Sequence, residues 1–586
     1  MALTSLAILV PLLAAVVLAA TTSLRRRRIA DVVALAAAVT SLGTCIALVV
    51  RASDRPVVAW LGGWHPRNGV ALGIDLFADQ LGAGLAAFAS VLAVAGLVVA
   101  LHQVDVAGHL FHALVLVVLA GMVGFCLAGD LFTAFVFFEL MGVSAYALAG
   151  FRVEERAPLE GSLNFAVTNS VGSLLLLFGI ALLYGRTGAL NLAQIGEAIA
   201  HHQPDALVAV AFALIACGLF VKAAIVPFHF WLADAYAVAP TSICLIFAGA
   251  LSELGLYGVA RVYWTVFSGP LEPHTETVRD VLLALGVATA LVGGAMCAAQ
   301  RHLKRLVAFA TVGHMGVLLC GVALLDDASL AGVAVFVVGD GLVKAGLFVA
   351  VGALEDRRGS VDEHELYGRG RDLRALGTLF CVCGLALAAM PPFGPFLGRA
   401  MIEDAASHQG LWWVAPVLVV ASALIGGAVL RVVRTVFLGR GPRPPRSPKF
   451  PAREAGEDPA ERENPSLATV IVALVLVGLG LVWGLVPGLV DAVTGAAAHF
   501  VDRSAYAATV LHGAPTRPPG VPGEAPTAAA WLWGVASAVL AIAIAGLRTV
   551  PVGVLRDLHS GRVGDYVAWL ATGTAVVAVV FALALP

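Results

Sequence analysis

The sequence predicts an all-α, polytopic membrane protein with about 14–16 transmembrane helices. Of its 586 residues, 60% are hydrophobic and only 13% are charged, whereas a soluble domain contains about 25% charged residues. Many nearly uncharged windows reach the roughly 20 residues that a helix needs to cross a bilayer. The net charge of −2 argues against nucleic acid as a partner.

Five apolar segments open the chain. The basic run at residues 25–28 follows the first of them. A signal peptide carries its basic residues in front of the apolar stretch, so we expect a membrane helix there. The five predicted spans are residues 4–22, 29–51, 80–101, 109–127 and 130–151.

Six further spans follow, and the second of them ends at Pro227. A helix broken by proline at membrane depth is tolerated only where protein or water satisfies the freed backbone groups. The break therefore predicts a functional region within the bundle. These six spans are residues 163–184, 206–227, 240–262, 278–298, 306–325 and 329–354.

Five more apolar segments complete the chain, and the first is long and broken at Pro391-Pro392. This break lies five spans after the break at Pro227, so the two helices enter the membrane from opposite sides. Such a relationship predicts two inverted five-helix repeats. The last five spans are residues 375–407, 412–433, 466–490, 527–548 and 563–585.

Lysine and arginine predict the orientation. With the N-terminus outside, the inner loops hold roughly three times as many Lys and Arg as the outer loops, which fits the positive-inside rule. We expect a multi-pass cell-membrane protein with a Pro-rich, charged, flexible cytoplasmic loop at 440–465. We also expect an external linker at 513–526 and a surface helix at 491–511. The expected domains are N-terminal helices (1–105), a core of inverted repeats (106–435), the loop (436–465) and a C-terminal transmembrane extension (466–586).

Two opposite charges lie inside predicted spans. Glu139 is in FTAFVFFELMGVSAYALAG, and Lys222 is in LIACGLFVKAAIV, just before Pro227. A buried ammonium needs a partner or water, and a lone carboxylate in the membrane would be protonated. We therefore expect Glu139 and Lys222 to pair. Static buried pairs contribute little net stability, so a role in ion movement is favoured over a structural one.

Two candidate proton-exchanging groups follow. Glu253 lies in the span after Lys222, and we interpret it as a second exchange site. The alternative is a packing carboxylate satisfied by Ser252 or by the backbone. His314 follows the basic turn at 301–305. Histidine can relay protons near neutral pH, although a lone histidine in an apolar helix is also a common hydrogen-bonded packing residue.

Two acid–base pairs have i,i+4 spacing, which places both members on one helix face. Asp340 and Lys344 either conduct protons or hold their helix. Arg399 and Glu403 follow the second break and form either an exit or a link to a neighbouring subunit. Arginine is essentially always protonated, so Arg399 would steer ions. We expect one line of charges at mid-membrane depth: Glu139, Lys222, Glu253, His314, Lys344 and Arg399.

The sequence gives no sign of a bound cofactor or metal. The eight cysteines all fall inside apolar spans, and none forms a CxxC motif, so we expect packing roles for them. No iron–sulfur, haem, nucleotide or flavin motif is present. Redox chemistry, if the protein belongs to a redox complex, would lie in another subunit.

The segment FVKAAIVPFHFWLADAYAVAPTS (220–242) resembles the signature of the proton-conducting antiporter-like subunits. These occur in respiratory complex I, in Mrp cation/proton antiporters and in membrane-bound hydrogenases of the hydrogenase-4 type. The signature is a lysine helix that runs into P-x-H-x-W-L-x-D-A-x-x-x-A-P-T. FFEL at Glu139, RHLKRLVAFATVGHMG, the D-x-x-x-K pattern and PPFGPFLGR add support. The resemblance covers about residues 60–430.

The resemblance implies that Glu139 pairs with Lys222 and that separation of the pair drives proton release. It implies a transport subunit for H⁺, with exchange for Na⁺ as a variant, without a redox centre of its own. Its partners would be other membrane subunits of a multisubunit complex and the lipid bilayer. Glu253 and Arg399 depart from the family, which usually carries Lys or His at the first position and Lys or Glu at the second.

Two other readings stay open. One is a subunit that itself binds quinone or a redox cofactor, against which the absence of cofactor motifs argues. The other is a non-conducting scaffold, for which Glu253 and Arg399 are the only support. Residues 460–586 match no signature.

Overall fold

The computed structural model describes residues 2–22, 27–101, 108–200, 205–441, 467–547, 555 and 558–584. Fifteen helices in these ranges are long and apolar enough to cross a membrane. The strands of the described part form one antiparallel hairpin, β1 (Val57–Trp60) with β2 (Asp75–Ala78). The predicted all-α membrane fold is confirmed. Most of the predicted loop at 440–465 lies outside the described residues.

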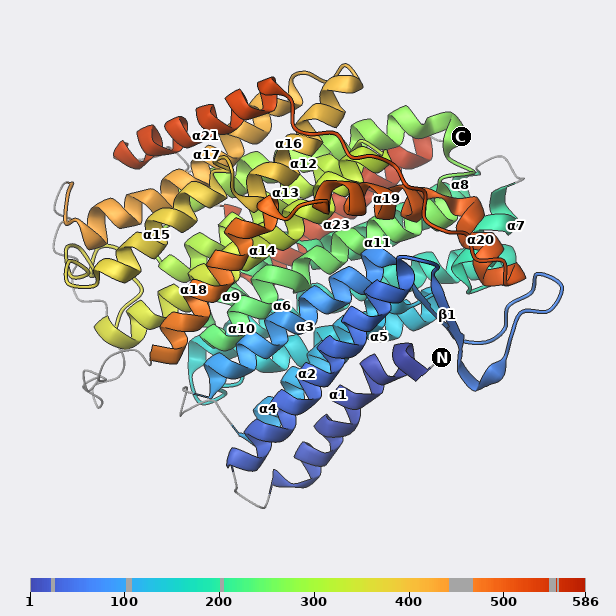
Figure 1. The fold of residues 1–586 in the computed structure, drawn as a ribbon, viewed down its shortest axis with the longest axis horizontal. Helices are drawn as coiled ribbons and strands as arrows, with labels where there is room; N and C mark the ends of the chain where they lie inside the picture. The colour runs from blue at the N-terminus through green and yellow to red at the C-terminus, as the bar shows by residue number, and fades with distance from the viewer. Residues whose placement is uncertain are drawn as a thin grey trace.

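The N-terminal helices lie at one edge of the bundle, and α17 and α21 lie at the opposite edge (Figure 1). Only 33% of the apolar window in each of the first two helices is buried, so most of their surface is free to face lipid. Asp79 and Asp130 cap the third and fifth helices by accepting hydrogen bonds from backbone N–H groups. These helices are α1 (Ala2–Ala20), α2 (Arg27–Ala52), α3 (Gln80–Ala100), α4 (His109–Leu127) and α5 (Leu131–Ala149).

The core of the bundle lies around α13, whose apolar window is 100% buried. The span that contains Glu253 is α-helical except for two π-helical turns, η3 (Phe247–Leu251) and η4 (Tyr263–Phe267). The other elements are α6 (Arg156–Thr187), α7 (Leu192–Ala200), α8 (Ala206–Ala223), α9 (Phe230–Val238), α10 (Thr241–Ile246), α11 (Ser252–Val262), η5 (Glu272–His274), α12 (Thr275–Ala299), α13 (Leu303–Ala323) and α14 (Asp327–Arg358).

The C-terminal third wraps around this core. The predicted surface helix at 491–511 is two helices, and the first of them, α19, packs on α14 and α3. Residues 514–527 connect to α21 without a helix. The elements are α15 (Arg374–Leu387), α16 (Gly394–His408), α17 (Val414–Val432), η6 (Val433–Phe437), α18 (Leu467–Val482), η7 (Trp483–Leu485), α19 (Leu489–Val501), α20 (Arg503–His512), α21 (Ala528–Gly546) and α23 (Val563–Ala584).

Both predicted helix breaks are present. The first separates α8 from α9, and the second separates α15 from α16. Ala224 (φ 51°) and Ala389 (φ 52°) take the left-handed conformation at these breaks, which is uncommon for a residue other than glycine. Each stands at the same spacing before its proline, Pro227 or Pro392.

The backbone hydrogen bonds of the two breaks also match. Ile225 N–H donates to the Phe220 carbonyl at 3.0 Å, and Met390 N–H donates to the Leu385 carbonyl at 3.1 Å. The chain therefore builds the same turn twice. This agrees with the expected repeat at the two positions where the backbone leaves the helix.

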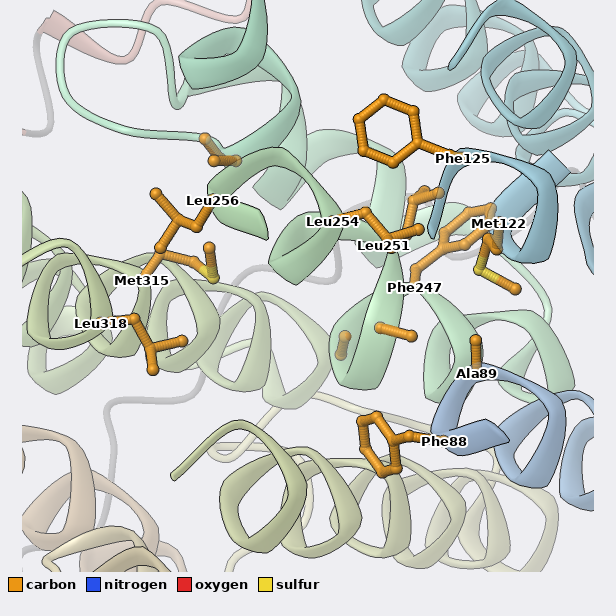
Figure 2. Packing of buried hydrophobic residues seen from close by; sticks show 14 of the residues in the cluster. Phe88, Ala89, Met122, Phe125, Phe247, Leu251, Leu254, Leu256, Met315 and Leu318 are labelled. Carbon is orange, nitrogen blue, oxygen red and sulfur yellow. The ribbon is translucent and has the colours of Figure 1, made fainter. Parts of the chain in front are cut away.

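Apolar side chains pack closely around the helix that carries Glu253. Figure 2 shows Leu251 and Leu254 between Met122 and Phe125 of α4 on one side and α13 on the other, with Phe88 of α3 nearby. All of these side chains are nearly inaccessible to solvent. Lipid chains are as apolar as these side chains, so close van der Waals packing holds the helix around its acidic residue.

Candidate functional site

Lys222 lies in the last turn of α8, directly before the first break. Its side chain is fully buried, and its Nζ has no hydrogen-bond partner among the described residues. The ammonium lies 4.7 Å from the ring centre of Phe138 and 6.0 Å from that of Phe165. Aromatic faces attract a cation, but they do not replace a hydrogen-bonded counter-charge. The break therefore holds a cation that lacks an ionic partner within contact distance.

Glu139 is half-buried on α5. Lys222 Nζ approaches α5 at Gly142, where an added Cβ atom would lie only 3.3 Å from it. Glu139 and Gly142 have i,i+3 spacing, so they share one helix face. The predicted Glu139–Lys222 ion pair is not formed in this structure: no oxygen of Glu139 lies within 4.0 Å of Lys222 Nζ. The glycine leaves room for the ammonium beside the helix that carries its expected partner.

Four predicted residues meet in one buried cluster. Lys344 Nζ donates to Glu253 Oε1 at 3.1 Å and lies 2.9 Å from Asp340 Oδ2. His314 Nδ1 lies 2.6 Å from Asp340 Oδ1. The four side chains are at most 1% exposed. We call this chain of contacts, Glu253–Lys344–Asp340–His314, the central cluster.

The central cluster joins α11, α13 and α14 and contains two acids and two bases. With His314 protonated its charges balance, and with His314 neutral it carries one negative charge in excess. Three of its atoms, Glu253 Oε2, His314 Nε2 and Asp340 Oδ2, are buried without a hydrogen-bond partner among the described residues, although Asp340 Oδ2 is in ionic contact with Lys344. A chain of this kind can accept or lose a proton at either end.

The structure rearranges the predicted line of charges. The i,i+4 contact between Asp340 and Lys344 is confirmed. Glu253, which we expected to continue the line from Lys222, contacts Lys344 instead. The described hydrogen bonds do not join the Ser252 side chain to Glu253; the Ser252 hydroxyl lies 3.1 Å from that of Tyr236.

Aromatic residues pack at the end of α8 that carries Lys222. Trp231 Nε1 donates to the Val221 carbonyl at 2.9 Å, and its ring stacks on Phe165 at 4.3 Å between centres. Tyr236 contacts Trp231 edge-on. Our reading of the sequence gave no role to Trp231 or Tyr236. Both lie in the signature motif that follows Pro227, and membership in that motif is the sequence feature that could have indicated them.

The second pair lies just after the second break. Arg399 Nε is 2.9 Å from Glu403 Oε1, so the predicted i,i+4 contact is confirmed. Arg399 Nη1 also donates to Ser537 Oγ at 3.1 Å and to the Ala388 carbonyl at 3.4 Å. Ser537 belongs to α21, in the part of the chain where the sequence offered no signal. The described contacts do not connect Arg399 to the central cluster.

Asp234 forms a comparable group after the first break. Arg305 Nη2 donates to its Oδ1 at 3.1 Å, and the Tyr566 hydroxyl donates to its Oδ2 at 2.7 Å. His559 Nε2 lies 3.8 Å away. Tyr566 comes from α23, the last helix. Arg305, from the basic turn at 301–305, thus holds Asp234.

The last two helices each pack on one break through a glycine. A Cβ atom on Gly573 of α23 would lie 2.5 Å from Pro227 Cγ. A Cβ atom on Gly534 of α21 would lie 2.9 Å from Pro391 Cδ. A residue larger than glycine at either position would force α23 or α21 away from the helix break that it packs against. The C-terminal extension therefore closes the outside of both discontinuous helices.

Known proteins share this sequence pattern. A sequence profile described as "NADH:quinone oxidoreductase/Mrp antiporter, TM" matches residues 128–426. The D subunit of the Na(+)/H(+) antiporter of Bacillus subtilis (strain 168) is 29% identical over 450 residues, which cover 75% of this chain and 88% of that protein. The N subunit of the NADH-quinone oxidoreductase of Desulforudis audaxviator is 28% identical over 459 residues, 77% of this chain and 89% of that protein.

Solved structures share the fold. A chain of the Mrp complex from Dietzia sp. DQ12-45-1b superposes with a TM-score of 0.76 at 29% identity, over 87% of this chain and 100% of that one. A chain of the archaeal membrane-bound sulfane sulfur reductase has a TM-score of 0.75 at 24% identity, over 87% and 99%. The profile match includes every predicted site residue, from Glu139 to Glu403. The chain therefore belongs to the NADH:quinone oxidoreductase/Mrp antiporter transmembrane family.

Proposed function

We propose that this protein is a proton-translocating subunit of a multisubunit membrane complex. The observation that carries the proposal is the central cluster, in which Glu253, Lys344, Asp340 and His314 are joined end to end at full burial. Replacing a buried ionic network by apolar residues is often neutral or stabilising. A structural need alone is therefore a weak reason for four titratable groups at this depth.

Lys222 would act as the switch. Its ammonium lies next to the face of α5 that carries Glu139, but it makes no ion pair with the Glu139 carboxylate. Two unit charges at 4 Å interact by about 4 kcal/mol at an effective dielectric constant of 20. Moving one charge against 100 mV costs about 2.3 kcal/mol. The interaction energy gained or lost when the Glu139–Lys222 pair forms or separates is therefore large enough to drive the release of a proton.

The proton would pass from Lys222 towards the central cluster. Tyr236 and Ser252, whose hydroxyls lie 3.1 Å apart, stand in the segment between them and offer exchangeable protons. Arginine does not itself exchange protons. Arg399 and Glu403 would therefore set the electrostatic potential at the second break and would not carry the proton. The name of the Bacillus relative favours Na⁺ as the exchanged ion if the complex is an antiporter.

We place the N-terminus outside and the 440–465 loop in the cytoplasm, because the excess of Lys and Arg then falls inside. Residues 106–435 would form the translocating core, flanked by the helices of 1–105 and the extension of 466–586. Other membrane subunits would be the partners. The redox chemistry, in a complex that has any, would lie in those partners.

Proton uptake into vesicles that contain the purified complex tests the proposal. Lys222→Ala should abolish uptake while the complex still assembles, and the exposed Glu160→Gln is the matched control. Uptake at the parental rate by an assembled Lys222→Ala complex would contradict conduction and favour the scaffold reading. Mass spectrometry of the subunits that co-purify with the tagged chain would identify the complex. A flavin, haem or iron–sulfur absorbance of the isolated chain would favour the cofactor-binding reading.

A further inference from the structure

A cavity of about 310 Å³ reaches Glu253 from one side of the bundle. Its outer end is lined by Val49 near the end of α2, Gln80 at the start of α3 and Leu330 at the start of α14. These helix ends all lie on the side that carries β1 and β2, because β1 follows α2 and β2 precedes α3. The cavity therefore runs from that side of the protein to the central cluster.

Glu253 lines this cavity and has one carboxylate oxygen without a partner. Its Oε1 binds Lys344, whereas its Oε2 is buried and has no hydrogen-bond partner in the described part of the chain. The residue itself is 2% exposed and lines the cavity. A buried carboxylate oxygen without a partner is costly. A water molecule in the cavity would donate a hydrogen bond to this oxygen, and a proton on it would remove the charge and donate to that water.

The walls of the cavity are apolar apart from a few groups. Besides Glu253, the lining residues that carry a polar side-chain group are Gln80, Tyr257 and Trp483. The volume is many times the 10–15 Å³ that one water molecule needs. Apolar walls with few polar groups fill with water and empty again at little cost, and such constrictions gate ion flow by dewetting.

The roof of the cavity is α19, which contributes Ala492, Ala496 and Phe500. This helix lies outside residues 128–426, the part that the family profile matches. A helix that the family profile does not include, α19, therefore covers the route from the protein surface to Glu253.

We infer that this cavity is the path by which protons pass between Glu253 and the side of the membrane that carries β1, β2 and α19. The inference rests on the proposed function. In each step the Oε2–H bond of protonated Glu253 breaks and a water molecule in the cavity takes the proton. The resulting carboxylate stays paired with Lys344. The reverse step reloads the site from the same side.

Filling the cavity tests the path. Ala496→Phe places a ring under the roof, whereas Ala498→Phe puts the same ring on a part of α19 that does not line the cavity. In vesicles containing the whole complex, we expect Ala496→Phe to slow proton uptake by about tenfold or more and Ala498→Phe to leave it unchanged. Parental uptake by an assembled Ala496→Phe complex would overturn the inference.

Thiol labelling covers the case in which Ala496→Phe does not assemble. Ala334 lines the cavity, whereas Ala331 lies one turn earlier on α14 and does not. A membrane-impermeant, bulky thiol reagent added on the β1–β2 side should modify Ala334→Cys, stop its proton uptake and spare Ala331→Cys. An inert Ala334→Cys, or uptake that continues after its complete modification, would overturn the inference.

The two proposals fail differently. If Lys222→Ala and Lys344→Ala abolish uptake while the cavity variants transport normally, conduction stands and only the path is wrong. If Lys222→Ala and Lys344→Ala complexes transport at the parental rate, the proposed function fails and the path fails with it.

Discussion

Asp234 and Arg399 occupy matching places, at the same spacing after Pro227 and Pro392, and each is bound by a side chain from one of the last two helices. Tyr566 of α23 donates to Asp234 at 2.7 Å, and Arg399 donates to Ser537 of α21 at 3.1 Å. The C-terminal extension thus reaches the charged residue behind each helix break. It is part of the site rather than a peripheral addition.

Removing the Tyr566 hydroxyl tests the first of these contacts. Tyr566→Phe takes one charge-assisted hydrogen bond from buried Asp234, and such bonds are worth about 1.5–3 kcal/mol. We expect a lower midpoint of thermal unfolding for the complex in detergent, while Arg305 still holds the carboxylate. The exposed Tyr184→Phe is the matched control. Equal midpoints for the two variants would show that α23 is not held through Asp234.

The central cluster should behave as one unit. Lys344→Ala leaves the buried Glu253 without its ionic partner and leaves Asp340 with His314 alone, and breaking a buried pair costs about 3–5 kcal/mol. Adding Glu253→Gln removes the orphaned charge of Glu253, so the double variant should be more stable than Lys344→Ala alone. Thermal unfolding of the single and double variants measures this coupling. Strictly additive effects would mean that the contact at 3.1 Å carries no coupling energy.

The sequence predicted which charged residues lie inside the helix bundle better than how they connect. Charges inside apolar spans are visible in any reading of the chain, and the Asp340–Lys344 contact follows from i,i+4 spacing within one helix. Lys344 and Glu253 are 91 residues apart, and Arg399 and Ser537 are 138 apart. Such contacts depend on how separate helices pack, which no local pattern reports. Ser537 also carries no charge, so nothing in its span drew attention to it.

Gly142 should be a sensitive position for Lys222. An alanine there would bring Cβ to 3.3 Å from Nζ, so the ammonium must shift away from the face of α5 that carries Glu139. We expect Gly142→Ala to reduce proton uptake although it removes no charge. Gly185→Ala is the control, because that site in α6 has open space around it and alanine favours a helix. Equal uptake by both variants would contradict an approach of Lys222 to α5 during turnover.

Asp75 should make stability fall as pH rises. It is fully buried in β2, where burial and, secondarily, the charge of Asp130 raise the pKa of its carboxyl to about 8. The Asn191 amide, which donates to it at 2.9 Å, only partly offsets this. Because the unfolded pKa is about 3.9, the folded state binds the proton more tightly. The contribution of protonated Asp75 to folding stability is fully present below about pH 4 and is lost as pH rises through about 8.

Asp75→Asn keeps an acceptor for Asn191 but cannot ionise, so the unfolding midpoint of this variant should fall less than that of the parent between pH 5 and about 8.5. The exposed Asp54→Asn should follow the parent. Parallel pH profiles for the parent and Asp75→Asn would show that Asp75 stays ionised in the folded protein.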